Sequence, residues 1–213
     1  MLYEKVRREV LRATLDLYRE GLIHLTSGNV SARASSEYIA ITPSRISYET
    51  MQPEDIVIID LNGNVVDGRH KPSSETPMHT LILRERADVN AVIHTHSMYV
   101  LAFAVLGRAI PLFCTEGLAI GGPVPVAEYA CPGTAATGQA ALKALEGPPP
   151  VNGVLLRNHG ALAIGTDLEQ AFGIACRIEI VARIYHLSLQ IGEPVAFTEE
   201  QIGEIRSRYI RSR

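Results

Sequence analysis

The amino-acid sequence predicts a largely antiparallel β-sheet with α-helices packed against it. Two observations support this fold class. Apolar runs rich in β-branched residues occur in pairs joined by tight turns, as at residues 56–66 and 151–164, which is typical of hairpins. Segments with the helical spacing of apolar residues separate these runs, and no linker, repeat or low-complexity segment divides the chain. We therefore expect one domain over residues 1–213.

The expected elements of the first half follow from apolar spacing and turn residues. Apolar residues at steps of four and three predict a helix over residues 2–20. Residues 38–42 and 56–61 are typical of strands, and the turn Asn62-Gly63-Asn64 predicts a hairpin. The run Ser73-Ser74-Glu75-Thr76-Pro77 predicts a helix start, with serine hydroxyls as caps and an early proline.

The second half alternates strands and helices. We expect strands at residues 90–96, 151–157 and 161–164, and helices at residues 97–105, 133–146, 167–190 and from 198 onwards. Asp167 is a typical N-cap, and Thr198-Glu199-Glu200-Gln201 matches a capping box. The Gly-rich run at 133–138 lacks the spacing of a nucleotide-binding loop, so we interpret it as a helix cap.

Composition excludes several classes of protein. Hydrophobic residues make up 46% of the chain, so it can bury a sizeable core. A net charge of −3 argues against a nucleic-acid-binding surface, which usually concentrates positive charge. No run of about 18 apolar residues predicts a membrane span. Three scattered cysteines and a charged first segment without an apolar core predict a cytoplasmic protein.

The pair His94 and His96 is the strongest functional signal in the sequence. Residues i and i+2 of a strand point to the same face, so the two imidazoles are spaced to share one metal ion. A catalytic metal site needs a third ligand, and His159 in the turn Asn158-His159-Gly160 is the best candidate. The alternative is that each histidine is a hydrogen-bonded structural residue. The other four histidines, including His79, show no such convergence, although His79 follows Glu75 by one helical turn.

Glu75 and three loops suggest acid–base chemistry on an anionic substrate. Glu75 is either a first-turn acid favoured by the helix dipole or a general acid or base beside the metal. Helix N-termini bind phosphate through free amides, to which Ser73 and Ser74 add hydroxyls. The loops Thr26-Ser27-Gly28-Asn29 and Thr42-Pro43-Ser44-Arg45 carry further donors. Both compositions are also ordinary turn chemistry.

These pieces in this order resemble the class II aldolase/adducin family, which includes L-fuculose-phosphate aldolase. The matching segments are TSGNVSAR (26–33), ITPS (41–44), KPSSE (71–75), NAVIHTHS (90–97), AIP (109–111), GG (121–122), EYACPGT (128–134) and LLRNHGALAIG (155–165). The resemblance covers nearly the whole chain. It implies an α/β fold of three layers, in which helices flank a central, mostly antiparallel sheet. It also implies a C4 homotetramer with active sites at subunit interfaces.

The resemblance also implies roles for individual residues. A divalent ion, typically Zn²⁺, is held by the residues matching His94, His96 and His159, a set that suits other divalent metals as well. The residue matching Glu75 moves the proton and contacts the metal when no substrate is bound. The phosphate group of a sugar substrate binds at the positions of Asn29, Ser44, Ser73 and Ser74, in a loop shaped by Thr26, Ser27 and Gly28.

The chain departs from the aldolase pattern at two positions. Thr115 stands where the aldolase carries a tyrosine that a neighbouring subunit donates to the aldehyde oxygen, and a threonine cannot replace a phenol as an acid. Tyr129 is nearby in the sequence, and Tyr209 in the last helix is the candidate for a tail tyrosine. Arg45 replaces a glycine of the aldolase pattern, so it either reinforces phosphate binding or binds another anionic group of the substrate.

The resulting hypothesis is a metal-dependent aldolase acting on a ketose 1-phosphate such as L-fuculose 1-phosphate. The first alternative is L-ribulose-5-phosphate 4-epimerase, whose pattern has Asp in place of Glu75. A methylthioribulose-1-phosphate dehydratase or aldolase is the second. A non-catalytic module like the adducin head is the third, but such a module has no need of three histidines.

Overall fold

The computed structural model describes residues 1–211 of the 213-residue chain, with side chains up to residue 208. Within these residues, eight strands form one sheet in the order β4-β3-β2-β1-β5-β8-β7-β6. The strands are β1 (Asn29–Arg33), β2 (Tyr38–Ile41), β3 (Val57–Asp60), β4 (Val65–Asp67), β5 (Ala91–Thr95), β6 (Val126–Ala127), β7 (Gly153–Leu156) and β8 (Gly160–Gly165). Neighbouring strands are antiparallel except for β6 and β7. The expected, mostly antiparallel sheet is confirmed.

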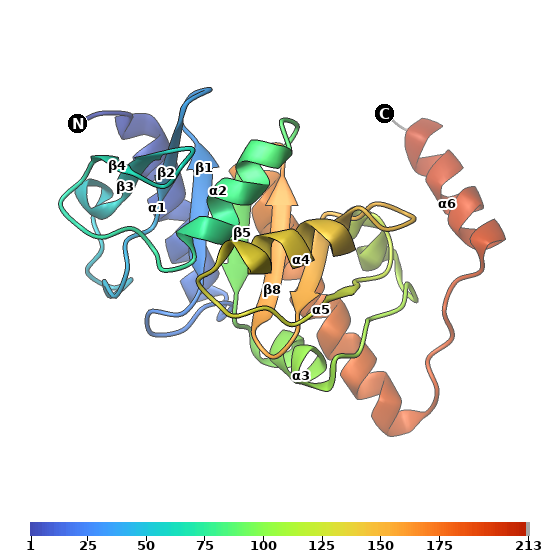
Figure 1. The fold of residues 1–213 in the computed structure, drawn as a ribbon. Helices are drawn as coiled ribbons and strands as arrows, with labels where there is room; N and C mark the ends of the chain where they lie inside the picture. Colours follow the sequence, from blue (N-terminus) through green and yellow to red (C-terminus); the bar gives the residue numbers. More distant parts are fainter. Residues whose placement is uncertain (212–213) are drawn as a thin grey trace.

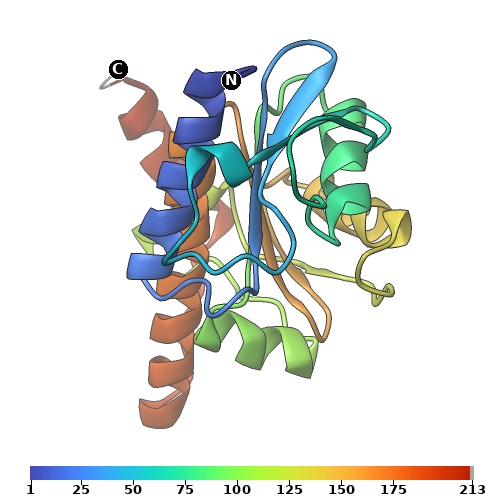
Figure 2. The ribbon, with the colours of Figure 1, turned by 90° about the vertical axis from the view of Figure 1, so that its left-hand side faces the viewer.

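Helices cover both faces of the sheet (Figure 1). The α-helices of the described residues are α1 (Glu4–Arg19), α2 (Thr76–Glu85), α3 (Met98–Leu106), α4 (Ala135–Leu145), α5 (Leu168–Ile191) and α6 (Glu199–Arg211), with 3₁₀ helices η1 (Pro53–Asp55) and η2 (Thr115–Ile120). With the sheet seen edge-on, α1 and α5 lie on one side and α2 and α4 on the other (Figure 2). The three-layer arrangement that the family resemblance implies is therefore present.

The central strands are apolar on both sides because both faces are covered. All five residues of β5 are buried, as are all six of β8. Ile93 belongs to the core on the side of α1 and α5, whereas Val92 belongs to the core on the side of α2 and α4. Continuous apolar runs are typical of strands that are buried on both faces.

In the described part of the chain, no helix is long and apolar enough to cross a membrane.

One strand at the centre of the sheet was not expected. β1 lies between β2 and β5, and Asn29 pairs with His94. Its sequence, NVSAR, alternates polar and apolar residues, yet Ser31 is fully buried. The sequence predicts a loop at residues 26–29 because the polar residues interrupt the apolar run that is typical of a buried strand. The histidine pair is also split by the strand end, since β5 ends at Thr95 and His96 follows it.

The predicted caps of α5 and α6 are present. The Asp167 side chain accepts a hydrogen bond from the Gln170 amide at 2.7 Å, and Thr198 and Gln201 form both bonds of a capping box. The Ser73 hydroxyl, which was expected to cap α2, accepts a hydrogen bond from the Glu75 amide at 3.2 Å just before the helix begins. Glu75 holds the N-cap position and its side chain makes no capping bond. The backbone amide of Ser73 donates to the Thr42 carbonyl at 3.0 Å, which ties this turn to the segment after β2.

Candidate active site

A pocket of about 290 Å³ opens at one end of the sheet. The start of β1, the end of β5 and the start of β8 meet there, as the pairs Asn29–His94 and Thr95–Ala161 show. The lining residues are Thr26, Ser27, Gly28, Asn29, Pro43, Ser44, Arg45, Ser73, Ser74, Glu75, His94, His96 and His159. Segments up to 133 positions apart in the sequence, from Thr26 to His159, thus contribute to one cavity.

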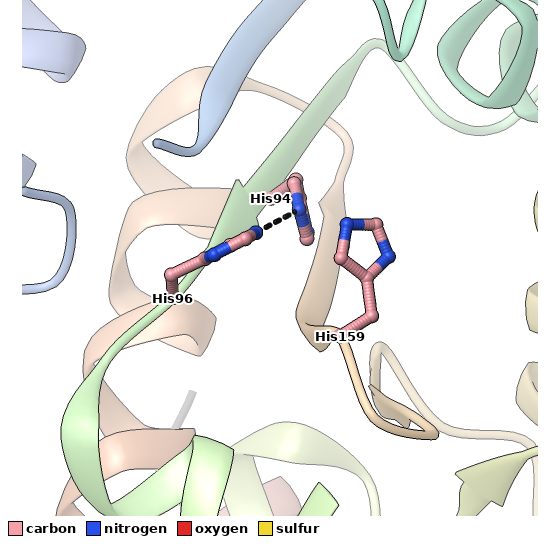
Figure 3. Close-up of side chains that lie close together, drawn as sticks. All are labelled: His94, His96 and His159. Carbon is pink, nitrogen blue, oxygen red and sulfur yellow. Dashed lines mark hydrogen bonds between the residues drawn. The ribbon is translucent and has the colours of Figure 1, made fainter. Parts of the chain in front are cut away.

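The three histidines lie together in this pocket (Figure 3). Each offers a ligand atom, and these atoms all lie within 4.8 Å of one another. His94 Nδ1 lies 2.9 Å from the carbonyl oxygen of Ala161. Because a carbonyl only accepts, Nδ1 carries the ring hydrogen, and the lone pair of Nε2 faces the cluster. The Nε2 atoms of His94 and His96 are 2.8 Å apart (Figure 3).

Gly160 allows this close approach, a role that sequence reasoning missed. A Cβ at this position would lie 2.3 Å from the Thr95 carbonyl oxygen and 3.1 Å from His94 Cε1. The preceding Asn158 has a left-handed backbone with φ 58°, a conformation that asparagine tolerates. The Asn-His-Gly turn therefore brings His159 and the start of β8 against β5. The sequence shows the glycine, but only the structure shows what it contacts.

The cluster is uncharged at neutral pH. Burial, and then the neighbouring charges of His96 and His159, hold the pKa of His94 well below its ordinary value. Burial lowers the pKa of His96 to about 4 and also lowers the pKa of His159. Neutral imidazole is the form that binds metal ions.

Two unpaired atoms show that the residues fit a cation. Among the described residues, His159 Nδ1 and Glu75 Oε2 are buried without a hydrogen-bond partner. Buried polar atoms are normally paired, so these two indicate a missing group. Three neutral imidazoles provide the three protein ligands of a catalytic metal site and leave a position for substrate. The Ala161 carbonyl, which fixes the His94 ring, is the outer support typical of such a ligand.

Glu75 lies at the edge of the cluster. Glu75 is 7% exposed, and its Oε1 atom lies 3.9 Å from His159 Nε2. Burial raises the pKa of the carboxyl, and a backbone hydrogen bond from Gly133 lowers it in part. A raised carboxyl pKa favours proton transfer near neutral pH. Gly133 belongs to the run that we interpreted only as a helix cap. Thr134 is indeed the N-cap of α4, but the same run also reaches Glu75.

The opposite wall of the pocket carries hydrogen-bond donors. Gly28 has φ 80°, and a Cβ there would lie 2.8 Å from the His94 carbonyl oxygen, so only glycine fits. The Tyr48 hydroxyl holds this loop, lying 2.7 Å from the Ser27 carbonyl and 2.9 Å from that of Gly28. Arg45 is exposed, and it is the one Lys or Arg side chain among the described lining residues. This wall is suited to an anion.

Two of the predicted site residues, Thr115 and Tyr129, do not line this pocket, and a third lies outside the residues whose side chains are described. Thr115 is exposed at the start of η2, where its hydroxyl lies 3.3 Å from a carboxylate oxygen of Glu116. Tyr129 is 60% exposed in the loop after β6. Tyr209 lies in α6, and its side chain is outside the described residues. His79, which the sequence gives as a structural or surface residue that could lie near the site, is fully buried against Asn29 of the pocket.

Comparison with known proteins identifies the family to which this fold and this site belong. The profile of the class II aldolase and adducin N-terminal domain matches residues 8–186, so the chain belongs to this family. A 5-deoxy-D-ribulose 1-phosphate aldolase from Bacillus thuringiensis serovar kurstaki is 37% identical over 211 residues, 98% of this chain and 97% of that protein. The L-fuculose phosphate aldolase of Escherichia coli K12 is 34% identical over 207 residues, 96% and 94% of the two chains. A solved L-fuculose 1-phosphate aldolase superposes with a TM-score of 0.90 at 37% identity, covering 96% of each chain.

Proposed function

We propose that this protein is a metal-dependent aldolase that cleaves a ketose 1-phosphate to dihydroxyacetone phosphate and an aldehyde. The observation that carries the proposal is one pocket that combines three neutral imidazoles, a buried carboxylate and a wall of donors. The imidazoles of His94, His96 and His159 would hold Zn²⁺ or a related ion, which Glu75 contacts when no substrate is bound. When bound, the ion supplies a Lewis acid for the negative charge that develops on the substrate oxygens.

The other lining residues of the pocket bind the phosphate group of the substrate in this proposal. Asn29, Ser44, Ser73 and Ser74 bind the phosphate group, in a loop shaped by Thr26, Ser27 and Gly28. Arg45 adds the positive charge that a dianion requires. Binding the phosphate far from the reacting carbon positions that carbon beside Glu75.

Glu75 is the proton carrier in this proposal. Cleavage breaks the bond between C3 and C4 and leaves its electron pair on C3, next to the carbonyl of dihydroxyacetone phosphate. The protonated Glu75 then delivers its proton to C3, while the C4 hydroxyl loses a proton and becomes the aldehyde. In the direction of synthesis, the Glu75 carboxylate removes the C3 proton. The carboxyl group has a raised pKa, which supports both roles.

The aldehyde end requires a further group, which accepts the proton of the C4 hydroxyl during cleavage and donates it back during synthesis. Thr115 cannot supply one, and no tyrosine lines the described pocket. We propose a cytoplasmic homotetramer in which a neighbouring subunit completes this end, with the exposed Tyr129 and, from the last helix, Tyr209 as the candidate phenols.

The substrate is a phosphorylated deoxy sugar in this proposal. The relatives described above act by name on 5-deoxyribulose 1-phosphate and fuculose phosphate, and both sugars end in a methyl group. An L-ribulose-5-phosphate 4-epimerase is a weaker candidate because its pattern carries Asp where this chain has Glu75. A methylthioribulose-1-phosphate aldolase or dehydratase remains the second alternative. A non-catalytic module leaves the buried, unpaired atoms of Glu75 and His159 without a purpose.

The decisive experiment is a cleavage assay on purified protein supplied with zinc. L-Fuculose 1-phosphate and 5-deoxy-D-ribulose 1-phosphate are offered, and released dihydroxyacetone phosphate is measured. We expect release from at least one, and about one metal ion per chain by elemental analysis. His94→Ala is the control for metal loss. No release from either sugar, together with no condensation of dihydroxyacetone phosphate with any aldehyde in a panel, would refute the aldolase.

A further inference from the structure

Three buried polar side chains lie in a row directly behind the pocket. His79, from α2, stands between Asn29 and Ser31, which share one face of β1. His79 Nε2 is 2.5 Å from Asn29 Oδ1, and His79 Nδ1 is 2.6 Å from Ser31 Oγ. His79 and Ser31 are fully buried, and Asn29 is 5% exposed. Of the three, only Asn29 lines the pocket.

With the Asn29 amide oxygen against His79, as the structure places it, the hydrogens in this row run in one direction. An amide oxygen only accepts, so His79 Nε2 must carry the hydrogen and donate it to Asn29 Oδ1. Burial lowers the pKa of His79 to about 3, so the ring is neutral and has one hydrogen. Its Nδ1 therefore accepts, and the Ser31 hydroxyl is the donor.

This arrangement decides which end of the Asn29 amide faces the pocket. Because Oδ1 is engaged by His79, the NH₂ group is the end that remains. Within the described residues this NH₂ is paired with no acceptor, yet it is not among the buried atoms that lack a partner. It therefore reaches the open space of the pocket that Asn29 lines.

We propose that His79 is a positioning residue that, together with Ser31, holds the Asn29 amide so that its N–H groups face the phosphate of the substrate. A phosphate dianion only accepts hydrogen bonds, and the reversed amide would set oxygen against oxygen. The proposal rests on the proposed function, in that the phosphate is the anion that Asn29 meets. It assigns a role to a histidine that touches neither substrate nor metal.

The first test is the tautomer of His79, which nuclear magnetic resonance reads in protein labelled with ¹⁵N-histidine. The His79 signals are assigned by their loss in His79→Gln. We expect hydrogen on Nε2 and a bare Nδ1. The opposite tautomer overturns the proposal, because a bare Nε2 must accept from the Asn29 NH₂ and so turns the amide oxygen to the pocket. This measurement is independent of catalysis and of phosphate binding.

The second test is a double-mutant cycle on the dissociation constant of inorganic phosphate, measured by calorimetry. His79→Leu is expected to weaken binding about tenfold, the effect of one charge-assisted hydrogen bond. In an Asn29→Ala background, His79→Leu is expected to cause no further loss. His186→Leu, on the distant α5, is the matched control and should leave the dissociation constant unchanged. Should His79→Leu fail to fold, Ser31→Ala replaces it, since it removes the donor to Nδ1.

The outcomes separate the two proposals. Unchanged phosphate affinity in His79→Leu overturns the positioning role alone. An equal loss with and without Asn29 shows a general structural effect and overturns it as well. Wild-type protein that binds no phosphate refutes the proposed function, and the positioning role with it.

Discussion

Replacement of Gly160 by alanine tests how the three histidines are held together. The new Cβ would lie 2.3 Å from the Thr95 carbonyl oxygen, 3.1 Å from His94 Cε1 and 3.2 Å from His96 Cδ2, whereas ordinary contact begins at 3.4 Å. The start of β8 must therefore move from β5 by about 1 Å, because packed interiors have little free space. Overpacking by one methyl group costs about 1–3 kcal/mol.

We expect Gly160→Ala to reduce activity strongly and to reduce thermal stability only moderately. A free-energy loss of this size lowers Tm by roughly 2–12 °C in a chain of this length. A displacement of about 1 Å at the reacting groups lowers activity by roughly 100-fold. Zinc affinity should fall as well, because His159 adjoins Gly160 and moves with it.

The assay combines thermal unfolding, zinc titration against a chromophoric chelator, and release of dihydroxyacetone phosphate. Gly203→Ala is the matched control, since a Cβ at Gly203 in α6 has nothing within 4 Å. This control should keep wild-type zinc affinity and gain about 0.5–1 kcal/mol, as glycine in a helix interior is unfavourable. Wild-type zinc affinity and Tm in Gly160→Ala would show that the contact with Thr95 does not hold the cluster.

Three further variants follow from the geometry. Glu75→Gln should retain zinc but lose exchange of the C3 proton of dihydroxyacetone phosphate with solvent; exchange at the wild-type rate would mean that another group is the base. Burial lowers the pKa of His79 to about 3, below the ordinary value of about 6.5. The unfolded state therefore binds a proton that the folded state excludes, and stability falls as the pH falls from about 6.5 towards 3, by about 1.4 kcal/mol per pH unit for this group. In thermal unfolding, the stability of His79→Gln should fall less steeply with decreasing pH over that range than the stability of the wild type. An equal pH dependence in the two proteins would contradict this explanation. Tyr48→Phe removes the hydroxyl that meets the Ser27 and Gly28 carbonyls and should cost about 1 kcal/mol. It should also weaken binding of inorganic phosphate, and unchanged binding would show that the loop needs no such support.

Local patterns in the sequence predicted most of the helices and strands. The helix expected at 167–190 is α5, Leu168–Ile191, and its cap at Asp167 is present. The pair of strands around Asn158-His159-Gly160 is the antiparallel pair of β7 and β8. These features depend on residues a few positions apart, so periodicity and capping residues are enough to find them.

Features that depend on distant residues were not predicted. The polar residues of β1 concealed a central strand, because the partner that satisfies Ser31 is His79, 48 positions away. The turn before α2 is also held by the bond from the Ser73 amide to the distant Thr42 carbonyl, which the local serine pattern did not predict. In the same way, the need for glycine at position 160 depends on a carbonyl at position 95.

The sequence alone established the fold class and the chemical types of the site residues, because apolar spacing, turn residues and the His-x-His pair are local. Convergence of these residues was decided by the sheet. Antiparallel pairing places the start of β1, the end of β5 and the start of β8 at one end, and so brings Asn29, His94 and His159 into one pocket. The protonation states were decided there too, since burial, which no single segment determines, keeps the imidazoles neutral and raises the pKa of Glu75.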